Sequence, residues 1–194
     1  MLIAVIIMLR IIGGNLRRRL LKVPGSGRIR PTSDKVRESL FNILGPELVT
    51  GSKFLDLFAG SGAVGIEALS RGSEFVTFIE SDSSHGKIIR ENLKTCDLIQ
   101  HGKVYCGDVF STLNNIPLNR KVYDIIFADP PYRFVNFDAL LRKIITNVSI
   151  PDYGVMVIEH STKVSLPEKV DDFAIYREYK YGDTTLSVYM KLKE

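Results

Sequence analysis

Cysteine and histidine are scarce in this sequence, and long apolar runs are missing. The 194 residues include two cysteines, Cys96 and Cys106, and three histidines. The cysteine spacing matches neither a disulfide framework nor a zinc site, so we expect two buried thiols in a reducing compartment, the cytoplasm. The histidines also lack metal-ligand spacing, and no metal is expected. No segment reaches the roughly 20 apolar residues that a membrane-spanning helix requires.

Glycine and proline show no periodic pattern. The 15 glycines and 8 prolines follow no repeat, and apolar residues recur along the whole chain. Collagen-like and disordered classes are therefore excluded. A content of 45% hydrophobic and 25% charged residues fits one globular domain with a short appendage.

Positive charge is concentrated at the amino-terminal end. Nine of the 26 Lys and Arg and one of the 22 acidic residues lie in residues 1–37, so this segment carries +8 and the rest carries −4. A basic arm on a mildly acidic body suggests that the arm contacts a polyanion. A merely solvated basic face remains an equal alternative at this point.

The first residues form a short apolar segment without the flanks of a signal peptide. No positive charge precedes the run, no cleavage site follows it, and Arg10 comes directly after it. A start at Met8 explains this lead, so residues 1–7 are expected to be a mis-assigned start. An extra edge strand or an interaction segment is the alternative.

Two short apolar stretches and an amphipathic helix follow. Leu9–Ile12 and Leu20–Val23 flank Gly13-Gly14-Asn15, which predicts a hairpin. A connector, Pro24-Gly25-Ser26-Gly27, leads to a helix expected from Asp34 to Leu44, with Ser33 as its N-cap and Gly45-Pro46 at its end.

From Lys53 onward, short apolar strands alternate with helical segments. The strand candidates are Lys53–Leu57, Phe75–Glu80, Lys103–Cys106, Tyr123–Ala128 and Tyr153–Glu159. The helix candidates are Ala63–Ser70, Ser83–Leu93, a short turn near Phe110–Leu113, and Phe137–Thr146. This alternation predicts an α/β fold with a mostly parallel sheet covered by helices. Phe173–Tyr179 and Thr185–Leu192, separated by Gly182-Asp183, predict a terminal antiparallel hairpin.

A glycine-rich turn follows the first of these strands. The segment Asp56-Leu57-Phe58-Ala59-Gly60-Ser61-Gly62 lets a ligand approach the backbone closely. NAD, FAD, S-adenosylmethionine or a simple packing turn would all explain the glycines. Asp56 favours S-adenosylmethionine, whose amino group is cationic and which has no pyrophosphate for a helix N-terminus.

Two more acids follow the next two strands. Glu80 ends its strand 24 positions after Asp56 and is suited to accept both ribose hydroxyls of a cofactor. Asp108 follows the next strand and is suited to accept from an adenine amino group. Either acid alone is more often an N-cap or a loop acid.

The fourth strand ends in Asp129-Pro130-Pro131-Tyr132. The prolines stiffen the turn and lack N–H groups, so the Pro130 carbonyl and the Asp129 carboxylate together can grip a planar amino group. Tyr132 supplies a face on which a flipped base can stack.

These motifs together resemble a known enzyme family. Arg10-Ile11-Ile12-Gly13-Gly14, Arg30-Pro31-Thr32, Val36–Asn42, the glycine turn and Asp129–Tyr132 are similar to the RsmD-like family of bacterial small-subunit ribosomal RNA guanine-N2 methyltransferases. The resemblance implies a class I, Rossmann-like methyltransferase with a seven-stranded sheet, in residues 46–194. Residues 1–45 would form an RNA-facing hairpin and a lid helix.

The resemblance also implies roles for single residues. S-adenosylmethionine would bind at Asp56, Phe58, Ala59, Gly60, Ser61, Gly62, Glu80 and Asp108, under a lid that includes Thr32 and Arg37. Asp129, Pro130, Pro131 and Tyr132 would hold the target guanine. The expected RNA contacts are Arg10, Arg17, Arg18, Arg19, Arg28 and Arg30. The expected partner is small-subunit ribosomal RNA within an assembled or assembling particle.

Three alternatives remain open. An amino-methyltransferase for another RNA, for DNA or for a protein amide shares the Asp-Pro-Pro-Tyr logic, but only 20 residues separate Asp108 from Asp129, which leaves no room for a DNA-recognition domain. A nicotinamide dehydrogenase would leave that motif unexplained. A non-catalytic ribosome-assembly protein would be expected to have lost Asp129 or the glycines, and neither is lost.

Overall fold

The main sheet of the protein is mostly parallel and ends in antiparallel strands. The computed structural model describes residues 7–24, 33–115 and 122–192. Within these ranges the main sheet contains β3 (Lys53–Leu57), β4 (Phe75–Glu80), β5 (Gly102–Cys106), β6 (Ile125–Ala128), β7 (Val155–Ser161), β8 (Lys169–Val170), β9 (Phe173–Tyr181) and β10 (Thr184–Lys191). Their order is β5-β4-β3-β6-β7-β10-β9-β8. The predicted α/β class and the terminal antiparallel pair are confirmed.

The strand count differs from the prediction by one. β8 pairs with β9 through only two residue pairs, Lys169 with Ala174 and Val170 with Phe173. A strand this short has no alternation that a sequence pattern can reveal, so eight strands occur where seven were expected. The first two strands of the parallel part, β3 and β4, have the predicted bounds.

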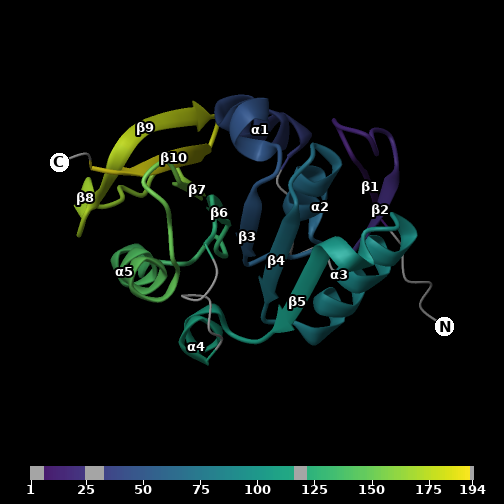
Figure 1. Cartoon of the computed structure of the whole chain (residues 1–194). Helices are drawn as coiled ribbons and strands as arrows, with labels where there is room; N and C mark the ends of the chain where they lie inside the picture. Colours follow the sequence, from purple (N-terminus) through teal and green to yellow (C-terminus); the bar gives the residue numbers. More distant parts are fainter. Residues whose placement is uncertain (1–6, 25–32, 116–121, 193–194) are drawn as a thin grey trace.

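Helices cover both faces of the sheet (Figure 1). One face carries α1 (Asp34–Val49), α2 (Ala63–Ser70) and α3 (Ser83–Thr95), and the other carries α4 (Val109–Asn115) and α5 (Phe137–Asn147). A short 3-10 turn, Ile99–His101, precedes β5. The side chains of β3 alternate between the two layers: Phe54 belongs to the core under α1–α3 and Leu55 to the core under α4–α5.

The direction of strand addition reverses beside β3. β3 pairs in parallel with β4 on one side and with β6 on the other. In open α/β sheets, ligands bind outside the carboxyl ends of the strands at such a switch point. The glycine-rich turn after β3 and the Asp-Pro-Pro-Tyr segment after β6 therefore meet where this topology favours a ligand.

α1 continues beyond its predicted end. Ser33 caps it as expected, because its side chain accepts from the Val36 N–H. Gly45 interrupts the helix with φ 72°, but another helical turn follows as far as Val49. Pro46 fits there because the first position of a helical turn needs no N–H donor. Within the described residues, Phe110–Leu113 is likewise part of a longer helix, α4, rather than a short turn.

The amino-terminal strands form a separate two-stranded ribbon. β1 (Ile7–Arg10) and β2 (Leu20–Val23) pair antiparallel, with Ile7 opposite Val23. Ile7, the last residue of the apolar lead 1–7, is the only residue of that lead in the described ranges. The connection between the two strands is longer than the predicted turn and rests on the carboxyl end of α2. There, the Asn15 N–H donates to the Ser70 carbonyl at 2.7 Å.

A fully buried carboxylate anchors this connection. The Glu67 side chain on α2 accepts from the N–H groups of Ile12 at 2.8 Å and Gly13 at 2.7 Å. Arg71 Nε donates to the same carboxylate at 2.9 Å. Because α2 begins directly after the glycine-rich turn, this contact ties the basic ribbon to the helix that closes that turn.

Candidate active site

The glycine-rich turn after β3 leaves an open approach to its backbone. Gly60 has φ 55° and Gly62 has φ 75°, both in the left-handed region. Among the described residues, only the Phe58 carbonyl oxygen comes within 4.0 Å of a Cβ at Gly60, so this part of the chain leaves the space above Gly60 open. A ligand can therefore approach the main chain at Gly60, as the sequence predicts.

Asp56 lies beneath this turn. Its side chain is 2% exposed and accepts from the Gly65 N–H at 3.0 Å, which holds the first turn of α2 against β3. The pKa of Asp56 is raised to about 8: burial is the main cause, the negative charges of Asp129 and Glu80 add to it, and the Gly65 hydrogen bond opposes it. The carboxyls of β3, β4 and β6 thus interact electrostatically. A cation bound among them would be stabilised.

Glu80 joins the glycine-rich turn to the end of β4. One of its oxygens accepts from the Gly60 N–H at 2.7 Å, and the other accepts from the Asp82 N–H at 2.8 Å. The side chain is 7% exposed. Oε1 also accepts from the Ser81 hydroxyl, at 3.4 Å, and Oε2 has a second lone pair that can accept from the ribose hydroxyls assigned to Glu80.

Asp108 is exposed at the start of α4. Its Oδ1 accepts from the Ser111 N–H at 3.0 Å, which is the geometry of an N-cap. The capping role that the sequence left open is therefore present. Contact with an adenine amino group stays a prediction, which the second carboxylate oxygen allows.

The Asp-Pro-Pro-Tyr segment leaves the sheet directly after β6. Asp129 is half-buried and Pro130 is buried, whereas Tyr132 is 77% exposed. The Phe134 N–H donates to the Pro131 carbonyl at 2.7 Å and closes the turn. The segment therefore begins with the half-buried Asp129 and presents the Tyr132 ring to solvent, where an incoming nucleobase can reach the ring.

An aromatic cluster, which sequence reasoning missed, supports these loops. The Phe134 ring lies 5.9 Å from Phe58, 6.3 Å from Phe110 and 5.0 Å from Phe137, between ring centroids. Phe58 itself has φ 60°, which is uncommon for a residue other than glycine. These rings come from the segments that follow β3, β5 and β6, including the starts of α4 and α5, so one cluster joins three parts of the candidate site. The sequence signal that could have predicted the cluster is the presence of four phenylalanines close to three of the motifs.

Comparison with known proteins assigns the chain to a family. The family model described as "Conserved hypothetical protein 95" matches residues 9–190. The chain belongs to this family. It is 40% identical over 183 residues to the "Putative rRNA methyltransferase YlbH" of Bacillus subtilis, covering 94% of this chain and 99% of that protein.

Two further relatives cover most of the chain. The "Ribosomal RNA small subunit methyltransferase D" of Escherichia coli K12 is 34% identical over 183 residues, which cover 94% of this chain and 90% of that protein. The solved structure titled "Putative methyltransferase yhhF from Escherichia coli" superposes with a TM-score of 0.81 at 32% identity, covering 96% of this chain and 99% of that one. The family resemblance predicted from the motifs is confirmed.

Arg37 does not lie where the predicted lid would place it. Its side chain is fully buried, and Nη2 donates to the Arg10 carbonyl at 2.6 Å and to Asp34 at 3.1 Å. Nε lies 3.6 Å from Glu67. A side chain without exposed surface offers nothing to a ligand, so the predicted cofactor contact of Arg37 is not supported, and in this family member Arg37 anchors the ribbon. Thr32 lies outside the described residues.

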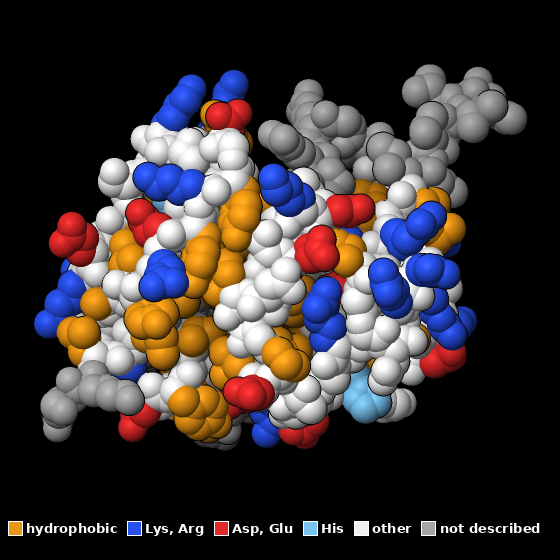
Figure 2. Space-filling view, turned by 90° about the horizontal axis from the view of Figure 1, so that it is seen from above, with side chains coloured by type: hydrophobic (Ala, Val, Ile, Leu, Met, Phe, Trp, Pro, Cys, Tyr) orange, Lys and Arg blue, Asp and Glu red, His pale blue; other side chains and the backbone are white. Residues whose placement is uncertain are grey.

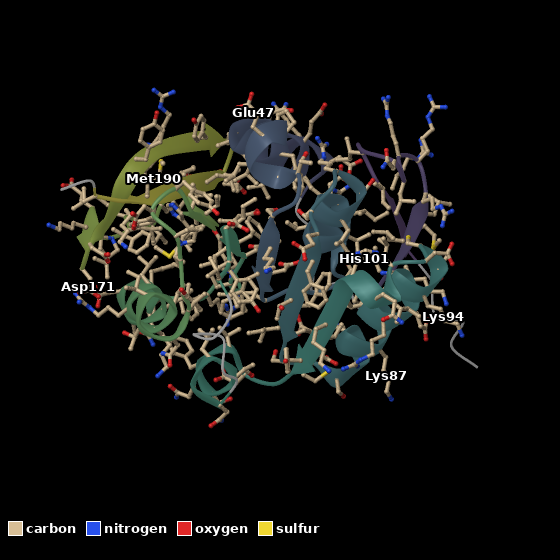
Figure 3. The ribbon with its side chains drawn as sticks, viewed as in Figure 1. Glu47, Lys87, Lys94, His101, Asp171 and Met190 are labelled. Carbon is tan, nitrogen blue, oxygen red and sulfur yellow. The ribbon has the colours of Figure 1, made fainter. Side chains whose placement is uncertain are left out.

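The predicted RNA-contacting arginines lie mainly on the ribbon. Arg10, Arg17, Arg18 and Arg19 are exposed, while Arg28 and Arg30 lie outside the described residues. Arg19 differs from the others because its Nη1 donates to the Thr95 carbonyl at 3.0 Å, at the end of α3. Lys94, on the same turn of α3, points away from the sheet (Figure 3). Lys and Arg side chains gather on the right of Figure 2, over this part of the molecule.

The two cysteines differ in exposure. Cys96 is buried, as predicted, but Cys106 is exposed, so the prediction of two buried thiols is wrong for Cys106. Cys106 ends β5, which is an edge strand of the sheet, and no neighbouring strand covers it there. The Arg90 guanidinium lies 3.4 Å from its sulfur.

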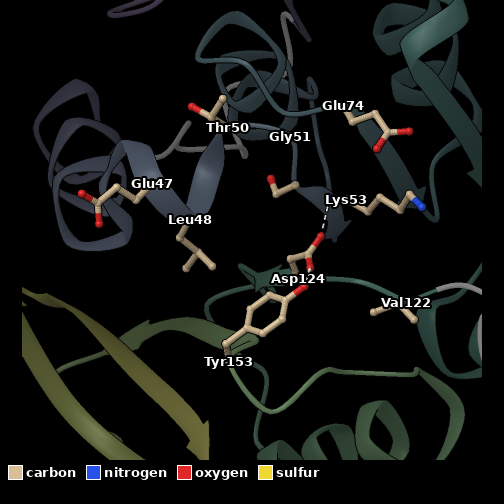
Figure 4. Close-up of a pocket in the computed structure, with 10 residues that line it drawn as sticks. Glu47, Leu48, Thr50, Gly51, Lys53, Glu74, Val122, Asp124 and Tyr153 are labelled. Carbon is tan, nitrogen blue, oxygen red and sulfur yellow. Dashed lines mark hydrogen bonds between the residues drawn. The ribbon is translucent and has the colours of Figure 1, made fainter.

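A depression of about 410 Å³ lies at the amino ends of the parallel strands, opposite the carboxyl ends that carry the predicted site (Figure 4). Its lining comes from residues at the amino ends of β3, β4 and β6, with Tyr153 donating to Asp124 at 2.8 Å. None of the predicted site residues lines it. Asp56, Glu80 and Asp129 instead lie at or directly after the carboxyl ends of these strands.

Proposed function

We propose that this protein transfers a methyl group from S-adenosylmethionine to the exocyclic N2 amine of a guanine in small-subunit ribosomal RNA. The observation that carries the proposal is the position of Asp129-Pro130-Pro131-Tyr132. The segment follows β6 directly, and its acid interacts electrostatically with Asp56 beneath the glycine-rich turn. The names of the relatives in Bacillus subtilis and Escherichia coli support a ribosomal RNA substrate.

The carboxyl groups at the site fit S-adenosylmethionine. When bound, this cofactor supplies a methyl group on a sulfonium, and it carries a second positive charge on its amino group. Burial raises the pKa of Asp56, and the nearby Asp129 and Glu80 carboxylates add to that rise, so a cation bound beside Asp56 would favour its ionised form. Asp56 and Glu80 would hold the cofactor at the open Gly60 backbone, with Asp108 beside the adenine.

The residues of the chain would then activate the guanine amine. Its lone pair is delocalised into the ring, so the amine is a weak nucleophile. Hydrogen bonds from the amine to the Asp129 carboxylate and the Pro130 carbonyl would favour a pyramidal nitrogen with a localised lone pair. Catalysis would rest on positioning and electrostatics, and the released proton would pass to Asp129 or to water.

The target guanine must leave its base pair to reach this site, because N2 lies on the edge of the base. The exposed Tyr132 ring would stack on the extruded base. The exposed arginines of the ribbon would bind phosphates, which supply affinity without reading sequence. Specificity would therefore come from the shape of folded RNA within a ribosomal particle, and the protein would act in the cytoplasm.

Methyl transfer by the purified protein tests the proposal. Small-subunit particles that lack the modification are incubated with S-adenosylmethionine labelled at the methyl group, and the RNA is digested to nucleosides. We expect label in N2-methylguanosine, at a much higher rate than with a short oligonucleotide of the same local sequence. Label in duplex DNA, in protein or in another nucleoside would contradict the proposal.

A further inference from the structure

The strand β9 carries aromatic and basic side chains on the face of the sheet that α1 covers. Arg177 pairs with Val188 and Tyr179 pairs with Leu186 on β10. Val188 and Leu186 belong to the core under α1–α3, so Arg177 and Tyr179 point to the same side. The register shifts between Ile175 and Arg177, which leaves Tyr176 at the irregularity and 65% exposed.

These side chains form a cation and ring arrangement in which Tyr176 and Arg177 are exposed and Tyr179 is half-buried. The Arg177 guanidinium lies 5.9 Å from the ring centroid of Tyr176 and 5.9 Å from that of Tyr179. The neighbouring acid, Glu178, lies on the opposite face of β9, where it accepts from the Ser187 hydroxyl at 2.9 Å. Arg177 is therefore a positive charge between two rings, and the adjacent acid is directed away from it.

This surface and the basic ribbon lie on the same side of the sheet. Ile11 and Leu21 of the ribbon segment belong to the core under α1–α3, and Tyr179 packs against the same core. Figure 2 views the molecule from this side: hydrophobic side chains with Lys and Arg between them occupy the left half, where β9 and β10 lie in Figure 1, and Lys and Arg gather on the right. One extended polyanion could contact both.

We propose that Tyr176, Arg177 and Tyr179 form a second RNA-contacting surface, on which unpaired nucleotides of the substrate stack. The inference rests on the proposed function, since it takes ribosomal RNA as the ligand. Tyrosine rings and guanidinium planes are the groups on which proteins stack unpaired RNA bases. The positive charge of Arg177 also suits the phosphate backbone. A purely apolar protein partner would not need this charge.

Binding of protein-free small-subunit ribosomal RNA tests this inference. The double variant Tyr176→Ala, Arg177→Ala is compared with the unsubstituted chain and with a matched control, Tyr153→Ala, Arg142→Ala. The control removes another exposed tyrosine and another exposed arginine, from the amino edge of the sheet and from α5. Thermal unfolding and S-adenosylmethionine affinity of each variant establish that it is folded.

We expect the β9 variant to bind the RNA about tenfold more weakly and the control to bind it as the unsubstituted chain does. Tyr176→Phe alone should retain binding, because the ring remains. Equal loss in the control, or unchanged affinity of the β9 variant for protein-free RNA, would overturn the inference. A defect seen only with particles would indicate a ribosomal protein as the partner and would also overturn it. If the unsubstituted chain bound particles but not protein-free RNA, the inference would be overturned and the proposed function would stand. Absence of binding to both would instead refute the proposed function.

Discussion

Two aspartates of the site differ in their surroundings, and the difference separates their roles. Asp56 is 2% exposed and accepts from a backbone N–H of α2, so it supports the glycine-rich turn. Asp129 is half-buried at the start of a loop that leads to an exposed tyrosine. In the proposed reaction, the first would therefore act on the cofactor side, and the second would hold the target base.

Replacing Asp129 should remove catalysis without removing cofactor binding. In Asp129→Ala, the guanine amine loses its carboxylate acceptor, so we expect methyl transfer to fall at least about 100-fold. S-adenosylmethionine affinity, measured by calorimetry, should stay within a few-fold of that of the unsubstituted chain, whereas Glu80→Ala should weaken it. A large cofactor defect in Asp129→Ala would refute this division of roles.

The raised pKa of Asp56 predicts a pH dependence. An aspartate in the unfolded chain ionises near pH 4, so the folded protein binds one proton more than the unfolded chain between about pH 4 and the Asp56 pKa of about 8. The stability of the ligand-free fold should therefore fall as pH rises across this window. Affinity for the cationic cofactor should rise over the same window, by at most about tenfold per pH unit, because the ionised carboxylate attracts it.

The variant Asp56→Asn is the control for this prediction. Its amide oxygen can still accept from the Gly65 N–H, but it does not ionise. Calorimetric titrations and denaturant unfolding at several pH values should show a weaker pH dependence in the variant than in the unsubstituted chain. Ionisation of the cofactor itself affects both titrations equally, so the comparison removes it. The same pH dependence in both proteins would show that Asp56 is not the titrating group.

At the scale of elements, the attachment of the ribbon to α2 depends on a close backbone approach. Gly14 has φ 73°, and a Cβ there would overlap the Ser70 carbonyl. Gly51 has φ 74° and nothing within 4 Å of such a Cβ. The two glycines have nearly the same positive φ and differ in the room that a Cβ would have.

Alanine at these two glycines should therefore have unequal effects. Gly51→Ala should cost about 1–2 kcal/mol, the cost of the left-handed conformation alone. Gly14→Ala should cost clearly more, because the ribbon must also move away from α2. Denaturant unfolding measures both, and equal destabilisation would contradict the described contact between the ribbon and α2.

The arginines of the ribbon should contribute unequally to RNA binding. Arg17 and Arg18 are exposed, whereas Arg19 is bonded to the Thr95 carbonyl and lies 3.8 Å from Asp97. Arg17→Ala, Arg18→Ala should weaken binding of ribosomal RNA and reduce the salt slope by about two. Arg19→Ala should reduce the slope by less than one, and Arg142→Ala should not change it. A slope that does not change in the double variant would exclude these two residues as phosphate contacts.

Elements bounded by strong local signals were predictable from the sequence. β3 and α2 have the predicted bounds, because the glycine-rich turn between them separates the apolar strand from the apolar helix. The second turn of α1 after Gly45 was not predictable, since it depends on packing of Val49 in the core. β8 was missed because its two residues carry no pattern.

The site was predictable where a residue acts through its place after a strand. Asp56 and Glu80 lie near the carboxyl ends of β3 and β4, and Asp129 directly follows β6, so the parallel pairing of these strands alone brings them to one edge. Contacts between distant segments left no local trace. The burial of Arg37 against the ribbon and the ring cluster around Phe134 both depend on tertiary packing.

At the scale of the whole molecule, one sheet brings the residues assigned to the cofactor close to those assigned to the target base. The carboxyl ends of β3 and β4 and the turn after β5 hold the acids assigned to the cofactor, and the loop after β6 holds the group assigned to the base. The basic ribbon is fixed to α2 by Glu67, so the proposed RNA contacts keep a constant orientation to the glycine-rich turn. Rigid attachment would allow shape recognition of a folded RNA.

Nucleoside mass spectrometry of small-subunit ribosomal RNA, from cells with and without the gene for this protein, tests the central claim most directly. The account predicts that one N2-methylguanosine is lost without the gene, is restored by the unsubstituted protein, and is not restored by Asp129→Ala. An unchanged content of N2-methylguanosine in cells without the gene, or full restoration by Asp129→Ala, would contradict it.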